Sequence, residues 1–242
     1  MKGLLEELDY CDCPLGKIIL RRRKVLSLAG EIIYDVILND EFLMSSLFHA
    51  AEDALADLGL EILNEPQADV IVGGLGLGYT AAAALRHAKV RSLCVVEFLE
   101  PVIRWHREGL LPVDPQPDKD PRTTIVHADF FALAAAGKGF NPASPGAKAH
   151  AILLDIDHTH SHWLHPRHAA FYSLEGMSLV RESLHPGGVF AMWADGFPDH
   201  DFVALLTEVF GKAEGREVSF PNPHTGDVSI STVYLAGGTL AR

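Results

Sequence analysis

The sequence is poor in cysteine and contains no long apolar run. Three cysteines, Cys11, Cys13 and Cys94, are too few for a disulfide framework and are typical of a reducing compartment. No stretch reaches the roughly 18 uninterrupted apolar residues that a membrane span requires. The start of the chain, MKGLLEELDY, also lacks the apolar core of a secretory signal. We therefore expect a cytoplasmic protein that does not bind membranes.

Basic residues are scarce relative to acidic ones. Twenty Lys and Arg residues face 32 Asp and Glu residues, which gives a formal net charge of −12. This balance argues against a nucleic-acid partner, because binding to phosphates depends on clustered positive charge. The basic run Arg21–Lys24 is interpreted as a solvated strand end rather than a phosphate patch. Cationic or small-molecule ligands suit this charge better.

The remaining composition is that of an ordinary globular protein. Hydrophobic residues make up 48% and charged residues 21% of the 242 residues, enough for one large domain or a core domain with an appendage. Two runs rich in β-branched residues, 16–28 and 30–40, predict an N-terminal β-hairpin. We assign 1–44 to this hairpin region and 45–242 to a Rossmann-like domain.

The longer region alternates between strand and helix patterns. A helix is predicted from Ser45 to about Leu60, with Ser45 or Ser46 as N-cap and Gly59 at its end. After it, strands are predicted at 69–72, 92–97, 123–127, 151–155 and 189–193, and helices at 79–87, 101–108, 130–136, 168–184 and 201–210. This order predicts an α/β fold with a doubly wound, mainly parallel sheet. Residues 216–236 predict an antiparallel hairpin with its turn at 221–227.

Four glycines stand where the first of these strands meets its helix. The segment VIVGGLGLGYT contains Gly73, Gly74, Gly76 and Gly78. Without side chains the backbone can approach a ligand closely, and a helix N-terminus offers free N–H groups. A tight turn alone would need fewer glycines. The spacing fits both a dinucleotide pattern and the form that holds an adenosyl sulfonium, so it leaves the ligand open.

Acidic residues follow the next three strands. Glu97 lies where a carboxylate can accept both hydrogen bonds of a ribose diol. Asp129 can bind an adenine amino group or cap the following helix. Asp155 and Asp157 are candidate catalytic residues, able to take a proton from an amine or to hold an ammonium group, although solvated loop acids are the alternative. Ligands of doubly wound sheets bind at the carboxyl ends of strands, which predicts one common site.

The loop after Asp155 is rich in histidine. It contains His158, His160, His162, His165 and His168. The stretch HTHSH resembles the zinc-binding segment of metallo-β-lactamase-like hydrolases, but that family has an aspartate where this chain has Ser161. We expect no metal in the site and interpret the loop as polar and partly exposed.

Taken in order, these residues resemble the spermidine synthases. The resemblance covers roughly Lys17 to Ala236 and depends on VIVGGLGLG, VVEFLEPVI and LHPGGV. The turn LHPGG is also typical of class I methyltransferases, which share the sheet. The resemblance implies a class I methyltransferase-type fold with a small N-terminal β appendage. It also implies a polyamine or other amine substrate and a homodimer or larger oligomer.

The resemblance implies a role for each site residue. The four glycines would pass beneath the aminoacyl or aminopropyl arm of decarboxylated S-adenosylmethionine or S-adenosylmethionine. Glu97 would bind the ribose, with Phe98 beside the adenine. Asp129 would bind the adenine amino group, and Asp155 would deprotonate the attacking amine.

Three departures from the family pattern keep other functions open. The family's turn carries an aspartate that holds the amine of the decarboxylated cofactor, whereas this chain has Gly76. The family has a second aspartate that binds the acceptor, and the corresponding carboxylate of this chain, Asp157, comes one residue earlier in the sequence. The family also has a Tyr-His-Glu stretch, which is matched here only by Phe48–Ala50. Aminopropyl transfer is the favoured hypothesis, with an S-adenosylmethionine-dependent methyltransferase as the alternative. A non-catalytic nucleoside-binding protein is a third. An NAD enzyme would leave Asp129 unexplained.

Overall fold

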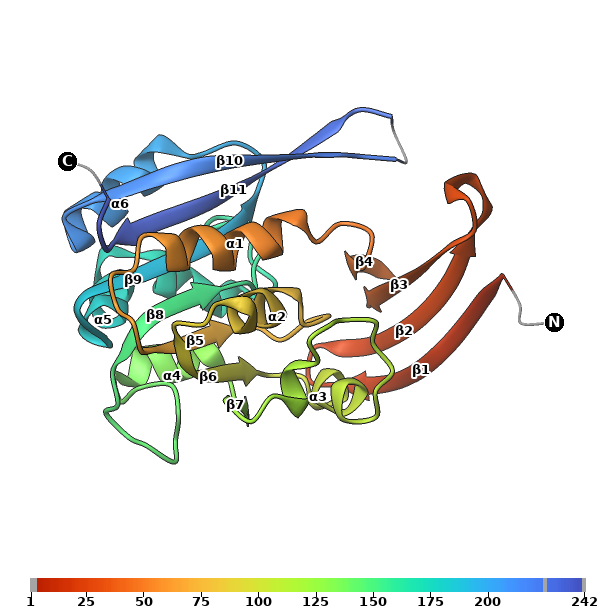
Figure 1. Cartoon of the computed structure of the whole chain (residues 1–242), viewed down its shortest axis with the longest axis horizontal. Coiled ribbons are helices and arrows are strands. Elements are labelled where there is room, and N and C mark those ends of the chain that lie inside the picture. The colour runs from red at the N-terminus through yellow and green to blue at the C-terminus, as the bar shows by residue number, and fades with distance from the viewer. Residues whose placement is uncertain (1–3, 224–225, 241–242) are drawn as a thin grey trace.

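The computed structural model describes residues 4–223 and 226–240 and contains two sheets (Figure 1). A four-stranded antiparallel sheet has the order β1-β2-β3-β4, and a seven-stranded sheet has the order β10-β11-β9-β8-β5-β6-β7. The predicted α/β fold, with a mainly parallel sheet, a C-terminal hairpin and a separate N-terminal β region, is confirmed. The predicted turn at 221–227 includes residues 224 and 225, which lie outside the described residues. None of the described helices is both long enough and apolar enough to cross a bilayer.

The N-terminal sheet is larger than the predicted hairpin. Its strands are β1 (Leu5–Cys13), β2 (Gly16–Val25), β3 (Glu31–Leu38) and β4 (Glu41–Ser45). The hairpin corresponds to β2 and β3, which pair in antiparallel register. The basic run of β2 is engaged in ion pairs within the sheet: Arg21 and Arg23 both reach the buried Asp35, at 3.2 and 2.6 Å. Asp35 therefore offsets part of this positive charge within the sheet.

The first helix, α1 (Ala50–Glu61), begins later than predicted. Ser45 belongs to β4 and donates a hydrogen bond to Asp35, so the predicted serine N-cap is wrong. His49 occupies the N-cap position instead. The helix also continues past Gly59, because this glycine faces the sheet: a Cβ there would lie 2.8 Å from Leu153. Gly59 thus permits close packing and does not end the helix.

The large sheet has five parallel strands and an antiparallel edge. The strands are β5 (Ala68–Gly73), β6 (Val90–Glu97), β7 (Thr123–His127), β8 (Ala149–Leu154), β9 (Leu184–Asp195), β10 (Ala213–Pro221) and β11 (Val228–Gly237). The helices are α2 (Tyr79–Arg86), α3 (Glu100–Arg107), α4 (Phe130–Ala136), α5 (Leu174–Glu182) and α6 (His200–Phe210), with short 3₁₀ helices η1 (Leu26–Leu28), η2 (Pro117–Lys119) and η3 (Pro166–Tyr172). The helix predicted at 168–184 is interrupted, because Ser173 is extended and caps α5 through its hydroxyl. The LHPGG segment lies at the start of β9 and bulges out of the sheet, because Leu184 pairs with Ala149 and Val189 already pairs with Ala151.

Two apolar clusters cover the two faces of this sheet. One joins α1, α2, α3 and the N-terminal sheet, and the other joins α4, α5 and α6. The chain runs from β5 outward to β6 and β7, and then returns to place β8 on the other side of β5. Such a reversal opens a crevice at the carboxyl ends of the strands, where ligands of doubly wound sheets bind. The N-terminal sheet lies beside that end (Figure 1).

Candidate functional site

The glycine-rich turn between β5 and α2 has a strained course that requires glycine. Gly74, Gly76 and Gly78 have φ angles of 91°, 48° and 94°, which other residues rarely adopt. A Cβ on Gly74 would lie 2.2 Å from the carbonyl oxygen of Asp155, so the turn runs directly against the end of β8. The buried His106 stabilises the turn by donating a hydrogen bond to the carbonyl of Gly76. The turn is thereby held in one conformation.

Glu97, at the end of β6, lies under this turn and is only 8% exposed. Its carboxylate accepts hydrogen bonds from the backbone N–H groups of Leu75 and Leu99, at 2.9 and 2.7 Å. Burial raises the pKa of Glu97, and these backbone hydrogen bonds oppose the rise. The backbone N–H groups of Gly76 and Phe98 also lower this pKa, so four backbone donors face the carboxylate.

The turn and Glu97 line a small cavity, which we call the Glu97 cavity, of about 90 Å³. Six of the residues predicted from sequence line it: Gly74, Gly76, Glu97, Phe98, Asp129 and Asp155. Most of the other lining residues are apolar, and β4, α3 and α4 contribute some of them. The structure thus places these six residues together, whereas Gly73 and Gly78, predicted with them, do not line this cavity.

Arg167 extends across this cavity and is a residue that the sequence analysis did not identify. Its guanidinium lies 3.0 Å from Asp129 and 5.5 Å from the ring centre of Phe98. Asp129 also caps α4 by accepting the N–H of Ala132, so the capping interpretation is correct. The Arg167 side chain is 49% exposed, so its position can change without disturbing the core. A planar group entering between Phe98 and Asp129 would replace this guanidinium.

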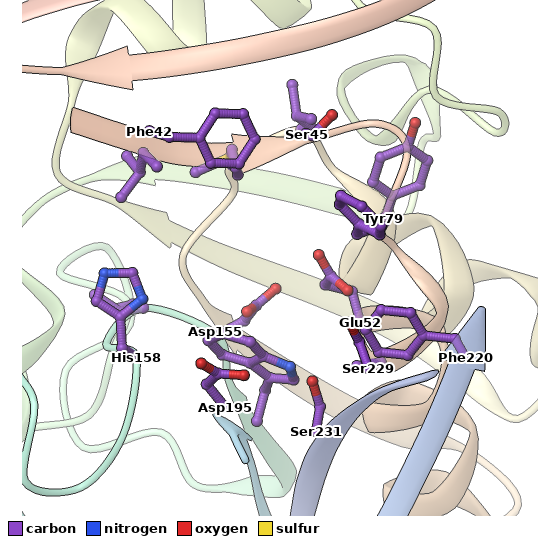
Figure 2. Close-up of a pocket in the computed structure, with 18 of the residues that line it drawn as sticks. Phe42, Ser45, Glu52, Tyr79, Asp155, His158, Asp195, Phe220, Ser229 and Ser231 are labelled. Atoms are coloured by element: carbon purple, nitrogen blue, oxygen red, sulfur yellow. The ribbon is translucent and has the colours of Figure 1, made fainter. Parts of the chain in front are cut away.

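A larger cavity of about 370 Å³ adjoins the first, and we call it the Glu52 cavity (Figure 2). It lies between β4, the start of α1, the glycine turn, β9 and the C-terminal hairpin. Its acidic residues are Glu52, Asp155 and Asp195, and its aromatic residues are Phe42, Phe48, Tyr79, Trp193 and Phe220. Asp155 and Gly76 line both cavities, so the two meet at the end of β8.

Asp155 is held in place at this meeting point. The hydroxyl of Thr80 donates a 2.7 Å hydrogen bond to its carboxylate. Burial raises the pKa of Asp155 to about 6, although the Thr80 hydrogen bond acts in the opposite direction. Burial and the neighbouring charge of Asp155 together raise the pKa of Glu52 to about 8. The two carboxyl groups therefore interact and disfavour each other's ionised form.

Asp157 lies elsewhere, at 3% exposure, and lines neither cavity. It accepts hydrogen bonds from the N–H of Leu164, the Nδ1 of His168 and the hydroxyl of Tyr172, at 2.8, 2.9 and 2.8 Å. These contacts fold the loop after β8 onto η3. The position gives Asp157 a structural role and lends no support to the predicted catalytic one.

The histidines of this loop serve several separate contacts. His158 lines the Glu52 cavity, and His168 is bound to Asp157. His160 lies 3.3 Å from Asp199, and His165 accepts the N–H of Arg167. His162 contacts the ring of His158, with 4.9 Å between centres. Among the described residues, no three His, Cys, Asp or Glu side chains are grouped so as to hold a metal ion.

Comparison with known proteins identifies the fold. No protein-family model and no curated protein matches the sequence. Solved structures that are similar to it include a spermidine synthase from Thermotoga maritima and a spermidine synthase in complex with the transition state analogue AdoDATO. In both cases the TM-score is 0.70 and the identity 17%, and the match covers 96% of this chain and 72% of the other. The chain therefore has the fold of the spermidine synthases.

Proposed function

We propose that the protein is an aminopropyltransferase-like enzyme, which binds decarboxylated S-adenosylmethionine in the Glu97 cavity and an amine acceptor in the Glu52 cavity. The observation that carries this proposal is that the two cavities meet at Asp155. A transfer reaction between two substrates needs two adjoining pockets with a proton acceptor at their junction. The similarity in fold to a spermidine synthase that binds a transition state analogue is further support.

In this proposal the nucleoside occupies the residues at the strand ends. Glu97, whose carboxylate lines the cavity, accepts hydrogen bonds from the ribose diol. The adenine lies beside Phe98, with its amino group on Asp129, and Arg167 moves away from both. The sulfonium arm then passes over Gly74 and Gly76 toward Asp155.

Asp155 acts as the base. An alkylamine with a pKa of about 10 arrives as an ammonium ion and must lose a proton before it can attack. Asp155 accepts that proton, and the nitrogen attacks the methylene next to the sulfonium. The C–N bond forms while the C–S bond breaks, and the electron pair of that bond stays on sulfur in methylthioadenosine. Alignment of nitrogen, carbon and sulfur lowers the barrier by on the order of several kcal/mol.

The absence of an acidic side chain at Gly76 favours a second candidate, a methyltransferase that uses intact S-adenosylmethionine. The carboxylate of that cofactor would approach the junction of the cavities, where Asp155 is ionised at neutral pH and Glu52 becomes ionised only beside a cation. Like charges at this separation repel, so the acidic junction supports the decarboxylated form.

The test is titration calorimetry with S-adenosylmethionine and with its decarboxylated form, in the same chelator-containing buffer. We expect at least a tenfold preference for the decarboxylated form, which corresponds to about 1.4 kcal/mol. Methylthioadenosine should then appear when an aliphatic amine is added, detected by mass spectrometry. Preference for the intact form would instead favour a methyltransferase. Binding without product for any donor and acceptor would indicate a nucleoside-binding protein.

A further inference from the structure

We infer that Glu52 is the counter-ion of the acceptor amine: its carboxylate exchanges a proton for the alkylammonium group and holds that nitrogen against Asp155 during transfer. This inference rests on the proposed function, because it assigns the acceptor to the Glu52 cavity. Glu52 belongs to no motif in the sequence, and only the packing of α1 against α2 and β8 brings it to Asp155.

The position of Glu52 on α1 directs its side chain into the cavity. It lies in the first turn of the helix, next to the buried Ala51, and lines the same cavity as Asp155. Figure 2 shows the carboxyl groups of Glu52 and Asp155 directed into one space, with Asp195 on the same side. Thr80 connects the two elements, since its hydroxyl contacts both the carboxylate of Asp155 and the backbone carbonyl of Glu52.

The charges around this cavity are unbalanced. Three carboxyl groups line it, whereas His158 is its only basic lining residue among those that the structure describes, and no lysine or arginine is present. The next acidic residue along the helix behaves differently: Asp53 is paired with Arg86 and His49, at 2.6 and 2.8 Å. The carboxylate of Glu52 forms no ion pair with any residue in the described ranges. A half-buried carboxylate without a cation, beside other carboxyl groups, is unfavourable, so this arrangement favours a positively charged ligand.

The raised pKa of Glu52 explains why its carboxyl group is stable in the cavity without a cation beside it. With a pKa raised to about 8, the carboxyl group holds a proton at neutral pH. An ammonium ion between Glu52 and Asp155 favours the ionised form, and the proton then leaves to solvent. The walls suit the rest of an alkylamine, because aromatic rings accept methylene groups and attract cations. These rings belong to Phe42, Phe48, Tyr79, Trp193 and Phe220.

The two carboxylates then have different tasks. Asp155 borders both cavities, so it takes the proton that the ammonium ion loses, which leaves a neutral amine. When the C–N bond forms and the C–S bond breaks, the positive charge moves from sulfur to nitrogen. The ionised Glu52 stabilises that charge before and after transfer, while the proton on Asp155 passes to solvent. Charge and protons therefore balance without a further reactant.

The experiment is titration calorimetry with 1,4-diaminobutane at pH 7 in buffers of different ionisation enthalpy, which reports protons released on binding. The wild-type chain should release close to one proton. Glu52→Gln should bind the diamine at least tenfold more weakly and release almost none, and Glu52→Asp should recover part of the release. The matched control is Glu61→Gln, the same change at the other end of α1, where the side chain is 68% exposed. It should behave as wild type.

Equal affinity and equal proton release in wild type and Glu52→Gln would overturn the inference. So would the failure of the wild-type chain to bind the diamine, alone and with methylthioadenosine present. Binding of methylthioadenosine, which we assign to the Glu97 cavity, shows that Glu52→Gln is folded. If the diamine binds with proton release but no adenosyl compound binds, the proposed function fails while the role of Glu52 as a cation partner stands. If the wild-type chain turns over and Glu52→Gln has an unchanged KM for the amine, the proposed function stands and the role of Glu52 as a cation partner fails.

Discussion

At the scale of single residues, Asp155 and Asp157 show how little sequence spacing says about role. They are two positions apart after the same strand, yet Asp155 borders both cavities and Asp157 is enclosed by hydrogen bonds from a loop and a 3₁₀ helix. The difference arises because the chain turns away from the sheet after Asp155. A carboxylate at the junction can exchange protons with a ligand, whereas one with three internal donors stabilises the loop.

The first prediction concerns Asp155→Asn. This change keeps the hydrogen bond to Thr80 but removes the base, so turnover should fall by roughly 10²- to 10⁴-fold. Adenosyl binding should change by no more than about twofold, since it depends mostly on contacts with ribose and adenine. Single-turnover assays and calorimetry measure the two quantities separately. Turnover close to that of wild type would exclude Asp155 as the base.

A second prediction concerns Arg167→Ala. The guanidinium occupies the space between Phe98 and Asp129 that we assign to adenine, so its removal should strengthen methylthioadenosine binding. A partly exposed ion pair contributes up to about 1 kcal/mol, which limits the gain to roughly fivefold. Arg107→Ala makes the same charge change on the exposed side of α3 and is the control. Weaker binding in Arg167→Ala alone would mean that the guanidinium contacts the ligand and does not compete with it.

At the scale of elements, the buried strands and the helices after them follow the predicted pattern closely. β5, β6, β7 and β8 begin and end within two residues of the predicted ranges. These strands are covered on both faces, so they are continuous apolar runs between turn signals. β1 and β4 escaped prediction because LEELDYCDC and EFLMS have few β-branched residues and depend on pairing with neighbours.

One contact between elements gives a third prediction. Asp9 of β1 accepts hydrogen bonds from Trp105 and Arg104 of α3, both at 2.6 Å, and Trp105 is fully buried. Asp9→Ala leaves the indole N–H without a partner, which should lower the free energy of unfolding by about 1–3 kcal/mol. Urea unfolding measures the loss. Asp12→Ala, on the exposed side of the same strand, should stay within about 0.5 kcal/mol of wild type. An equal loss in both variants would contradict the prediction.

At the scale of the whole molecule, the acidic cavity links stability to pH. The pKa of Glu52 rises from an ordinary 4.5 to about 8 in the folded chain, so the folded state binds this proton more tightly than the unfolded state. The resulting stabilisation is complete below about pH 4.5 and is lost as pH rises through about 8. Asp155 acts in the same direction, from 3.8 to about 6. Other titratable groups facing Glu52 are Asp53, Tyr79, Asp195 and His158.

The fourth prediction follows from this linkage. The melting temperature of the ligand-free chain should fall between pH 5 and pH 8.5, and the fall should be smaller in Glu52→Gln. Addition of 1,4-diaminobutane should restore stability at the higher pH in wild type, because the ammonium replaces the proton. Thermal melts at fixed ionic strength measure both effects. Parallel curves for wild type and Glu52→Gln would show that Glu52 is not titrating in the folded state.

Two further expectations at this scale stay predictions. The division into residues 1–44 and 45–242 agrees in position with the end of β4, but the N-terminal sheet and the helices share one apolar cluster. The expected homodimer or larger oligomer is measurable by light scattering.

The sequence by itself determined the parallel sheet, the glycine turn and the acidic residues at the strand ends. These features depend on local patterns: an apolar run specifies a buried strand, and the residue after it is placed at the carboxyl edge whatever the rest of the chain does. Glu97, Asp129 and Asp155 were therefore found without a structure. Only the tertiary structure decided that Glu52 and Arg167 reach the same site, because each comes from a separate element that packing alone brings there. It also removed Asp157 from the site, since hydrogen bonds with residues 7 to 15 positions away fold its loop inward.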